Sequence, residues 1–407
     1  MSPSLPELAQ QESTEIQRLR RDFHAHPEIS FQETRTSDVI ARYLEDLGLD
    51  VTRPDGMTGL WADLPCQGAT RTLCFRADMD ALAMDEAKTP GKAGFVSQNP
   101  GAAHCCGHDS HMAMLLGAVR LLATDQAPRS CNLRFLFQHA EELSPGGAKD
   151  LIEAGCIEGV DEIYGIHVIP PIPSGLFDVM EGPFMAAADE ITIRIQGRGG
   201  HAAMPHLLRA PIAASSPVSA ALQQIVSRNT SPFQSLVISI ASIRAGSGTS
   251  NVIPDTCTLH GTVRTLDTTL WEQMPDLIEQ RAGAAARSAG CEIELDYKRG
   301  YPVLVNHPEA TRKAREAAVA LYGEECLLPQ PQALMGGEDF ARYLEHIPGC
   351  YVFLGVGNPD KDITAANHHV DFDVDEDILP RGTAWFLQLA QSDQSTPDYP
   401  EDLKEDA

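Results

Sequence analysis

Residues 104–111 read His-Cys-Cys-Gly-His-Asp-Ser-His, and this stretch decides how the rest of the chain is interpreted. Cys106 and His108 stand two residues apart around Gly107, a spacing that lets a turning backbone point both side chains at one metal ion. A thiolate and a neutral imidazole suit zinc, manganese, nickel or cobalt. The apolar run 112–122 predicts a helix that anchors the stretch. The pattern alone also fits a structural zinc site, so its interpretation depends on matching groups elsewhere.

Three apolar stretches precede polar residues able to hold a metal. These predicted strands and the residues that follow them are 73–77 with Asp78 and Asp80, 133–137 with Glu141 and Glu142, and 162–166 with His167. In open α/β sheets, chemistry gathers at the carboxyl ends of the strands. Adjacent residues in extended chain point in opposite directions, so one of two neighbouring glutamates can bind metal while the other faces a water. The pattern predicts a parallel, helix-flanked sheet, although solvated acids in a turn are an equal alternative for Asp78 and Asp80.

Residues 188–297 show a different pattern of predicted strands and helices, after a plausible hinge at Gly182 and Pro183. Strands are expected at 191–195, 236–243, 256–263 and 292–297, with helices at 211–228 and 270–288. This βαββαβ order predicts a ferredoxin-like unit inserted into the first fold.

The 407 residues are therefore expected to form two domains. The fold class is α/β: a catalytic domain with a helix-flanked, mostly parallel sheet, and an inserted ferredoxin-like α+β lid. We assign 14–184 and 298–392 to the catalytic domain and 185–297 to the lid. The ends, 1–13 and 393–407, are predicted to be disordered, the latter because it is acidic and contains proline.

Composition excludes several partners and suggests a compartment. A formal charge of −26 and a pI near 4.8 argue against nucleic-acid binding, which needs a basic face. No stretch approaches the roughly 18 apolar residues of a membrane helix. The polar N-terminus has no apolar core of a signal peptide. Ten scattered cysteines then indicate reduced thiols, and we expect a cytoplasmic enzyme.

Taken together, the motifs resemble the M20 metallopeptidase family, in its branch of hippurate hydrolases, N-acyl-amino-acid amidohydrolases and auxin-conjugate hydrolases. The resemblance runs from about His24 to Leu389. It rests on the motifs RADMDAL (76–82), HCCGHDSH (104–111), AEE (140–142), GIHV (165–168), GRGGHAAMPH (197–206), NVIP (251–254), GTVRT (261–265), MGGEDF (335–340) and HHVDFDVDE (368–376).

This resemblance implies a role for each matching residue. Two divalent ions, Mn, Zn, Ni or Co, would be held by Cys106, His108, Glu142, His167 and His368. Glu141 would be the general base and Asp80 would orient the ligands. In the lid, His201 would stabilise the oxyanion, commonly in the partner subunit's site. Asn251, Arg264 and Gly336 would contact a small-molecule amide, and a homodimer through the lid is expected.

Some positions leave alternatives open. Cys105 stands where alanine is usual, so either thiol could be the ligand, and His369 is the alternative to His368. His111 is expected to be a helix residue or a group beside the ligands. Several departures from the family pattern flank the site, among them His139 before the AEE motif.

The resemblance implies hydrolysis of the amide of an N-acyl amino acid or a related conjugate. The first rival is a dipeptidase, or a hydrolase of an amide outside amino-acid metabolism. The second rival is a catalytically silent metal-binding protein on the same scaffold, against which Glu141 argues, because a storage site needs no general base.

Overall fold

A computed structural model describes residues 3–89 and 91–391. The tail predicted at 393–407 lies outside the described residues. The chain divides into two compact units. The first runs to Gly182 and includes Val305–Gln332 and the chain from Asp339 onward. The second comprises Pro183–Leu304 and Ala333–Glu338.

The first unit is built on a seven-stranded sheet in the order β1-β2-β4-β3-β5-β15-β6. Its strands are β1 (Val51–Thr52), β2 (Leu60–Leu64), β3 (Thr72–Asp78), β4 (Asn132–Gln138), β5 (Glu162–Pro173), β6 (Phe177–Asp178) and β15 (Gly349–Gly357). The four central strands β4, β3, β5 and β15 are parallel, and antiparallel strands complete both edges. The near-continuous apolar runs of β3, β4 and β15 suit strands that are covered on both faces.

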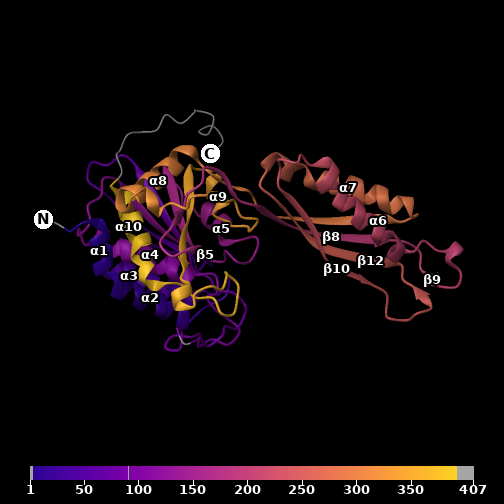
Figure 1. Cartoon of the computed structure of the whole chain (residues 1–407), viewed down its shortest axis with the longest axis horizontal. Helices are drawn as coiled ribbons and strands as arrows, with labels where there is room; N and C mark the ends of the chain where they lie inside the picture. Colours follow the sequence, from indigo (N-terminus) through magenta and orange to yellow (C-terminus); the bar gives the residue numbers. More distant parts are fainter. Residues whose placement is uncertain (1–2, 90, 392–407) are drawn as a thin grey trace. The chain divides into compact units, whose positions relative to one another are not determined.

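Helices flank this sheet (Figure 1). They are α1 (Leu5–Gln11), α2 (Ser13–Ala25), α3 (Thr34–Asp46), α4 (His108–Ala123), α5 (Gly147–Glu153), α8 (Pro308–Tyr322), α9 (Ala341–Leu344) and α10 (Leu379–Ala390). In Figure 1, α4 and α10 lie on one side of β5, and α5 and α9 on the other. Helix α4 is buried along almost its whole length and contacts β3, β4 and β5, so it fixes the 104–111 stretch against the sheet.

The N-terminal segment corrects one prediction. Residues 1–13 were expected to be disordered, yet α1 occupies Leu5–Gln11. Glu7 accepts the Ser4 N–H at 2.7 Å, as in a capping box, and this bond stabilises the start of the helix. Leu8 and Ala9 are buried, and α1 packs against α10. The short polar sequence conceals a helix because its stability comes from tertiary packing.

The second unit is a four-stranded antiparallel sheet in the order β10-β12-β8-β13, with helices α6 and α7. Its elements are β8 (Ala187–Gln196), β9 (Gly200–His201), α6 (Pro211–Gln224), β10 (Leu236–Ala245), β11 (Val252–Ile253), β12 (Thr256–Thr265), α7 (Thr268–Ser288) and β13 (Glu292–Tyr301). The βαββαβ order and this strand order confirm the ferredoxin-like unit. We call it the lid.

The observed boundaries differ in detail from those assigned above. Strand β13 continues to Tyr301, and the backbone N–H of Ala186 donates to the carbonyls of Leu334 and Gly336. Residues 298–304 and 333–338 therefore belong with the lid. The strands β7 (Gly182–Met185) and β14 (Leu304–Asn306) pair with each other. No helix among the described residues is long and apolar enough to cross a membrane.

Candidate metal centre

The start of α4 presents Cys106 and His108 to the carboxyl end of the sheet. Gly107, between them, has a φ of 102°, a left-handed conformation that favours glycine. A Cβ atom there would lie 2.3 Å from Cγ2 of Val168. Glycine therefore permits both the turn into α4 and its close approach to β5. Both flanking side chains are buried.

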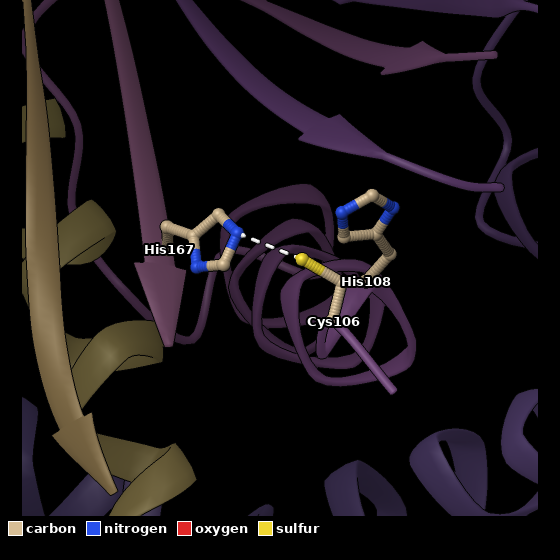
Figure 2. Close-up of side chains that lie close together, drawn as sticks. All are labelled: Cys106, His108 and His167. Atoms are coloured by element: carbon tan, nitrogen blue, oxygen red, sulfur yellow. Dashed lines mark hydrogen bonds between the residues drawn. The ribbon is translucent and has the colours of Figure 1, made fainter. Parts of the chain in front are cut away.

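His167 projects from β5 toward this turn (Figure 2). It lies within the strand rather than at its end as predicted, because β5 continues to pair with β15 as far as Pro173. Its Nδ1 lies 2.9 Å from the carbonyl of Val168, which fixes the proton on that nitrogen. Its Nε2 is then unprotonated and lies 3.4 Å from Sγ of Cys106. Burial holds the pKa of His167 well below its usual value, so the imidazole is neutral, as a metal ligand must be.

Two glutamates from the loop after β4 place their carboxylates near His108. Glu142 Oε1 lies 3.2 Å from Nε2 of His368 and 3.8 Å from Nε2 of His108. Glu141 Oε2 lies 3.9 Å from the same nitrogen of His108. The loop carrying His368 is tied to the turn before α4, because the His368 N–H donates to the carbonyl of Cys105 at 2.7 Å.

These donors fit a metal-binding site. The groups with ligand atoms within 4.8 Å of one another include Cys106, His108 and His167; Cys106, Glu142 and His368; and His108, Glu141 and Glu142. Nε2 of His108 and Oε1 of Glu142 are buried and have no hydrogen-bond partner in the part of the chain that is described. Buried polar atoms are normally satisfied, so a cation is the partner that this donor set accommodates.

Asp80 orients the donors from behind. Its Oδ1 accepts the Glu141 N–H at 3.0 Å and lies 3.3 Å from Nδ1 of His108. Its Oδ2 accepts the Glu142 N–H at 2.9 Å. A carboxylate against the far nitrogen of a histidine directs the other nitrogen at a metal and raises its basicity.

His111 has no ring nitrogen available to bind a metal. Its Nδ1 donates to Asp78 at 2.6 Å, and its Nε2 accepts the Val168 N–H at 2.9 Å. Because both ring nitrogens are engaged, His111 supports the site from α4. Burial would raise the pKa of Asp78, but His108, His111 and Arg76 hold it well below its usual value. Asp78 is therefore a buried anion beside the cluster.

The electrostatics of the site favour cations. Burial opposes a charge on His108, but Asp78, Asp80 and Glu142 raise the pKa of its imidazole to about 10. Burial and the two neighbouring glutamates raise the pKa of the Cys106 thiol well above its usual value. Such a thiol forms a thiolate only when a positive charge arrives, and metal binding would displace the protons of both groups.

The fold distinguishes the two pairs of alternative ligands that the sequence left open. Cys105 is buried in the apolar core beside α4, whereas Cys106 belongs to the donor cluster. His369 is exposed, and its Nδ1 accepts the Asp371 N–H at 3.1 Å. Cys106 and His368 are thus the members of each pair that the fold brings to the site.

The lid brings two further candidates together. His201 on β9 and Asn251, which adjoins β11, lie on one short ribbon, where the Ala202 N–H donates to the Asn251 carbonyl. The His201 side chain is exposed, and its Nδ1 accepts the Ala203 N–H at 3.1 Å. Because Nδ1 accepts this hydrogen bond, a proton on a neutral His201 ring would be carried by Nε2.

Arg264 lies on β12 and is half-buried. Its Nε donates to the Thr262 hydroxyl at 3.2 Å. Burial lowers the pKa of its guanidinium, against the opposing charges of Asp189 and Glu190. Gly336 adjoins Gly337, where a Cβ atom would lie 2.6 Å from that of Ala188 and 3.5 Å from an Arg264 nitrogen. The close packing falls on Gly337, which the sequence interpretation did not select.

Sequence reasoning also missed two residues that donate hydrogen bonds beside the metal centre. The Ser30 hydroxyl donates to Oδ2 of Asp80 at 2.6 Å. The Asn367 amide donates to the carbonyls of Cys106 and Val168 at 2.9 and 3.2 Å. Asn367 precedes a candidate ligand, a position that could have drawn attention to it, whereas Ser30 carries no local signal.

Comparison with known proteins agrees with this geometry. Residues 74–392 match the peptidase family M20/M25/M40. The chain is 37% identical to an N-acetylcysteine deacetylase of Bacillus subtilis, over 93% of this chain and 96% of the relative. It is 41% identical to an N-acyl-L-amino acid amidohydrolase of Geobacillus stearothermophilus, over 74% and 80%.

A solved structure shares the whole architecture. A Bacillus subtilis protein described as a dinuclear metal binding peptidase from the M20 family superposes with a TM-score of 0.80 at 33% identity, over 93% of this chain and 97% of that one. The predicted fold class, the family resemblance and the class of metal-dependent amide hydrolase are thereby confirmed. The chain belongs to the peptidase family M20/M25/M40.

Proposed function

We propose that this enzyme hydrolyses the amide of an N-acyl amino acid or a closely related conjugate, releasing a carboxylic acid and a free amine. The observation that carries the proposal is a glutamate, Glu141, beside a cluster of five candidate ligands and connected to it through the loop after β4. The relatives named for N-acyl amino acid hydrolysis and N-acetylcysteine deacetylation support this substrate class.

Two divalent ions would be held by Cys106, His108, Glu142, His167 and His368. Mn, Zn, Ni or Co suits one thiolate, three imidazoles and one carboxylate. When bound, such a pair lowers the pKa of a water and stabilises charge on the amide oxygen. Support for this set comes from the ligand distances and the orphaned atoms of His108 and Glu142.

Glu141 acts as the general base. Its carboxylate takes a proton from the attacking water as the carbon–oxygen bond forms, and delivers it to the nitrogen as the amide bond breaks. Asp80 holds the Glu141 backbone and thereby sets where the base stands.

The lid supplies binding groups for the substrate. The guanidinium of Arg264 is always charged and binds a carboxylate in two-pronged fashion, which suits the free carboxylate of an N-acyl amino acid. The group that its Nε contacts, the Thr262 hydroxyl, is uncharged. Nε2–H of His201 donates to the developing oxyanion, while Asn251 and the turn at Gly336 complete the contacts.

The enzyme works as a homodimer through the lid, with His201 acting in the partner's site. Strand β10 is an edge of the lid sheet and leaves one row of backbone groups unpaired in that sheet. Such edges invite pairing, and a two-fold dimer closes the arrangement. Mixing His201→Ala with Glu141→Gln subunits restores activity if His201 acts in trans, because one site of each mixed dimer is intact. No recovery despite subunit exchange would place His201 in its own chain's site or outside catalysis.

The compartment is the cytoplasm. All ten cysteines are unpaired, and nine of them are buried, as expected of a protein that meets a reducing environment.

A substrate panel tests the proposed function. Protein loaded with Mn, Co, Ni or Zn is assayed for amine release from N-acetyl and N-aromatic-acyl amino acids, from dipeptides, and from amides lacking a carboxylate. We expect turnover of N-acyl amino acids and at least tenfold weaker turnover of amides without the carboxylate. Preference for dipeptides would establish the rival dipeptidase. Metal binding without hydrolysis of any amide would establish the silent binding protein.

A further inference from the structure

Besides the candidate ligand His368, two residues near the candidate metal centre have a left-handed backbone conformation. Phe31 has a φ of 65° and Ala140 a φ of 53°, in the left-handed region that disfavours side chains with a Cβ. Ala140 immediately precedes Glu141. Phe31 follows Ser30, whose hydroxyl binds Asp80. Such conformations persist only where the surrounding structure holds them.

One carboxylate oxygen holds both. Oε1 of Glu33 accepts the Phe31 N–H at 3.0 Å and the Ala140 N–H at 2.8 Å. Oε2 of Glu33 accepts the Thr58 hydroxyl at 2.6 Å. Glu33 immediately precedes α3, and its carbonyl accepts the Ser37 N–H, so the start of the helix fixes its position.

Together with Asp80, Glu33 accounts for the loop that carries both glutamates. The backbone N–H of Ala140 donates to Glu33, and those of Glu141 and Glu142 donate to Asp80. Three consecutive amides are thus bound by two buried carboxylates. The carbonyl of Ala140 accepts the Gly147 N–H at 3.1 Å, which closes the loop against α5.

Glu33 keeps this place at a cost to stability. Its side chain is fully buried, and burial raises the pKa of its carboxyl to about 6, so it is charged in the interior at neutral pH. A buried charge is retained where its hydrogen bonds require it. Here those bonds lead to the loop of the general base.

We propose that Glu33 is a positioning residue for catalysis, which holds Ala140 in its left-handed conformation and thereby directs Glu141 and Glu142 into the metal centre. Glu33 is not a member of the donor groups described above. The proposal rests on the proposed function for the role of Glu141, whereas its effect on metal binding through Glu142 can be measured independently of any substrate.

The test compares Glu33→Ala with Glu33→Gln. Alanine removes the acceptor, so the loop can leave its left-handed turn. We expect kcat to fall about 10–10²-fold, in line with a small misplacement of a catalytic group, while KM changes less than about threefold. Affinity for Co or Zn, measured by competition with a chelator, should fall about tenfold because Glu142 shifts. Glutamine can offer one oxygen to both amides and its NH₂ to Thr58, so it should restore most of both properties.

Ala140→Gly provides the rescue. Glycine adopts the left-handed region without steric cost, so the loop then needs Glu33 less. In the Glu33→Ala background, Ala140→Gly should recover at least half of the lost kcat on a logarithmic scale. The metal affinity should recover to the same extent. If Glu33→Ala does not fold, the double variant is compared with Ala140→Gly alone. If neither folds, Glu33 is a residue of the fold and the proposal is overturned.

Glu162 serves as the matched control. It is also a buried carboxylate of the first unit, and it binds Arg71, Lys313 and the Tyr164 hydroxyl. Glu162→Gln should lower the melting temperature while leaving kcat and metal affinity of the folded protein unchanged. Equal effects of Glu33→Ala and Glu162→Gln on kcat and metal affinity would refute a positioning role. If the wild-type enzyme cleaves no amide, the proposed function fails, but the metal affinities still decide the role of Glu33.

Discussion

Replacing Asp80 with asparagine tests how the metal centre is held together. The Asp80 carboxylate accepts the Glu141 and Glu142 amides on separate oxygens, and the second oxygen also accepts the Ser30 hydroxyl. Asparagine keeps one oxygen and replaces the other with an NH₂ group. Ser30 can turn to accept from that group, but one of the two backbone N–H groups must lose its acceptor.

The expected size of the effect follows from the loss of this one hydrogen bond. A buried donor without a partner costs about 1–3 kcal/mol. If the loop instead moves to recover a partner for this N–H group, Glu141 and Glu142 are displaced. A free-energy cost of the same size then corresponds to about a 5–150-fold loss of kcat or metal affinity. Burial would raise the pKa of Asp80, but His108 and the other hydrogen-bond donors hold it below its usual value, so a negative charge is also removed from beside His108. We therefore expect metal affinity to fall about 10–100-fold and kcat to fall to a similar extent.

The assay measures metal affinity by chelator competition and kcat at saturating metal, on protein whose melting curve shows it to be folded. Ser30→Ala is the control, because it removes only the hydroxyl and leaves both amide contacts with Asp80 in place. It should retain metal affinity within about threefold. Wild-type metal affinity and kcat in Asp80→Asn would refute the view that this carboxylate organises the site.

Four further variants address the base, the two adjacent thiols and a buried acid. Glu141→Gln should keep both metals and lower kcat by roughly 10²–10⁴-fold with a smaller change in KM, and wild-type kcat would exclude it as the base. Cys106→Ser should lower the metal content measured by mass spectrometry, because a hydroxyl is a poor ligand for these ions, whereas Cys105→Ser should not; the reverse result would exchange their roles. Asp178 has a buried Oδ1 without a partner among the described residues, and burial raises the pKa of its carboxyl to about 6. The folded state thus holds its proton more tightly than the unfolded state, so this group reduces stability as the pH rises from about 4 to about 6. Asp178→Asn should raise the free energy of unfolding above pH 6 by up to about 3 kcal/mol and flatten that pH dependence in denaturant titrations, and lower stability at pH 7 would contradict it.

The sequence predicted the two-unit fold because its signals are strong and local. Apolar strands such as 73–77 and 133–137 are uninterrupted, and the predicted positions agree with β3 and β4 to within one residue at each end. The order of elements in the lid defined its topology without any knowledge of contacts. Element ends were less predictable where pairing decides them, as in β5, whose continuation beyond His167 depends on β15.

The candidate site was predictable where a residue type carries its own chemistry. Cys106, His108 and His167 are recognisable as donors in the sequence, and the fold brings them within ligand distance of one another. The choice between Cys105 and Cys106 needed the direction of the side chains. Supporting residues were not predictable, because Ser30 and Glu33 act through contacts far along the chain, with Asp80 and Ala140 respectively. A buried serine or glutamate has no sequence pattern that announces such a partner.

The central claim is that five side chains hold two divalent ions on which amide hydrolysis depends. Titrating metal-free protein with Zn or Co, while following bound metal and amine release from an N-acyl amino acid in the same samples, tests it most directly. We predict an inactive metal-free enzyme, two ions bound per chain at saturation, and activity that rises with occupancy. Two results would contradict the claim: metal-free protein that hydrolyses the substrate at the full rate, or protein that binds no metal at saturating metal concentrations.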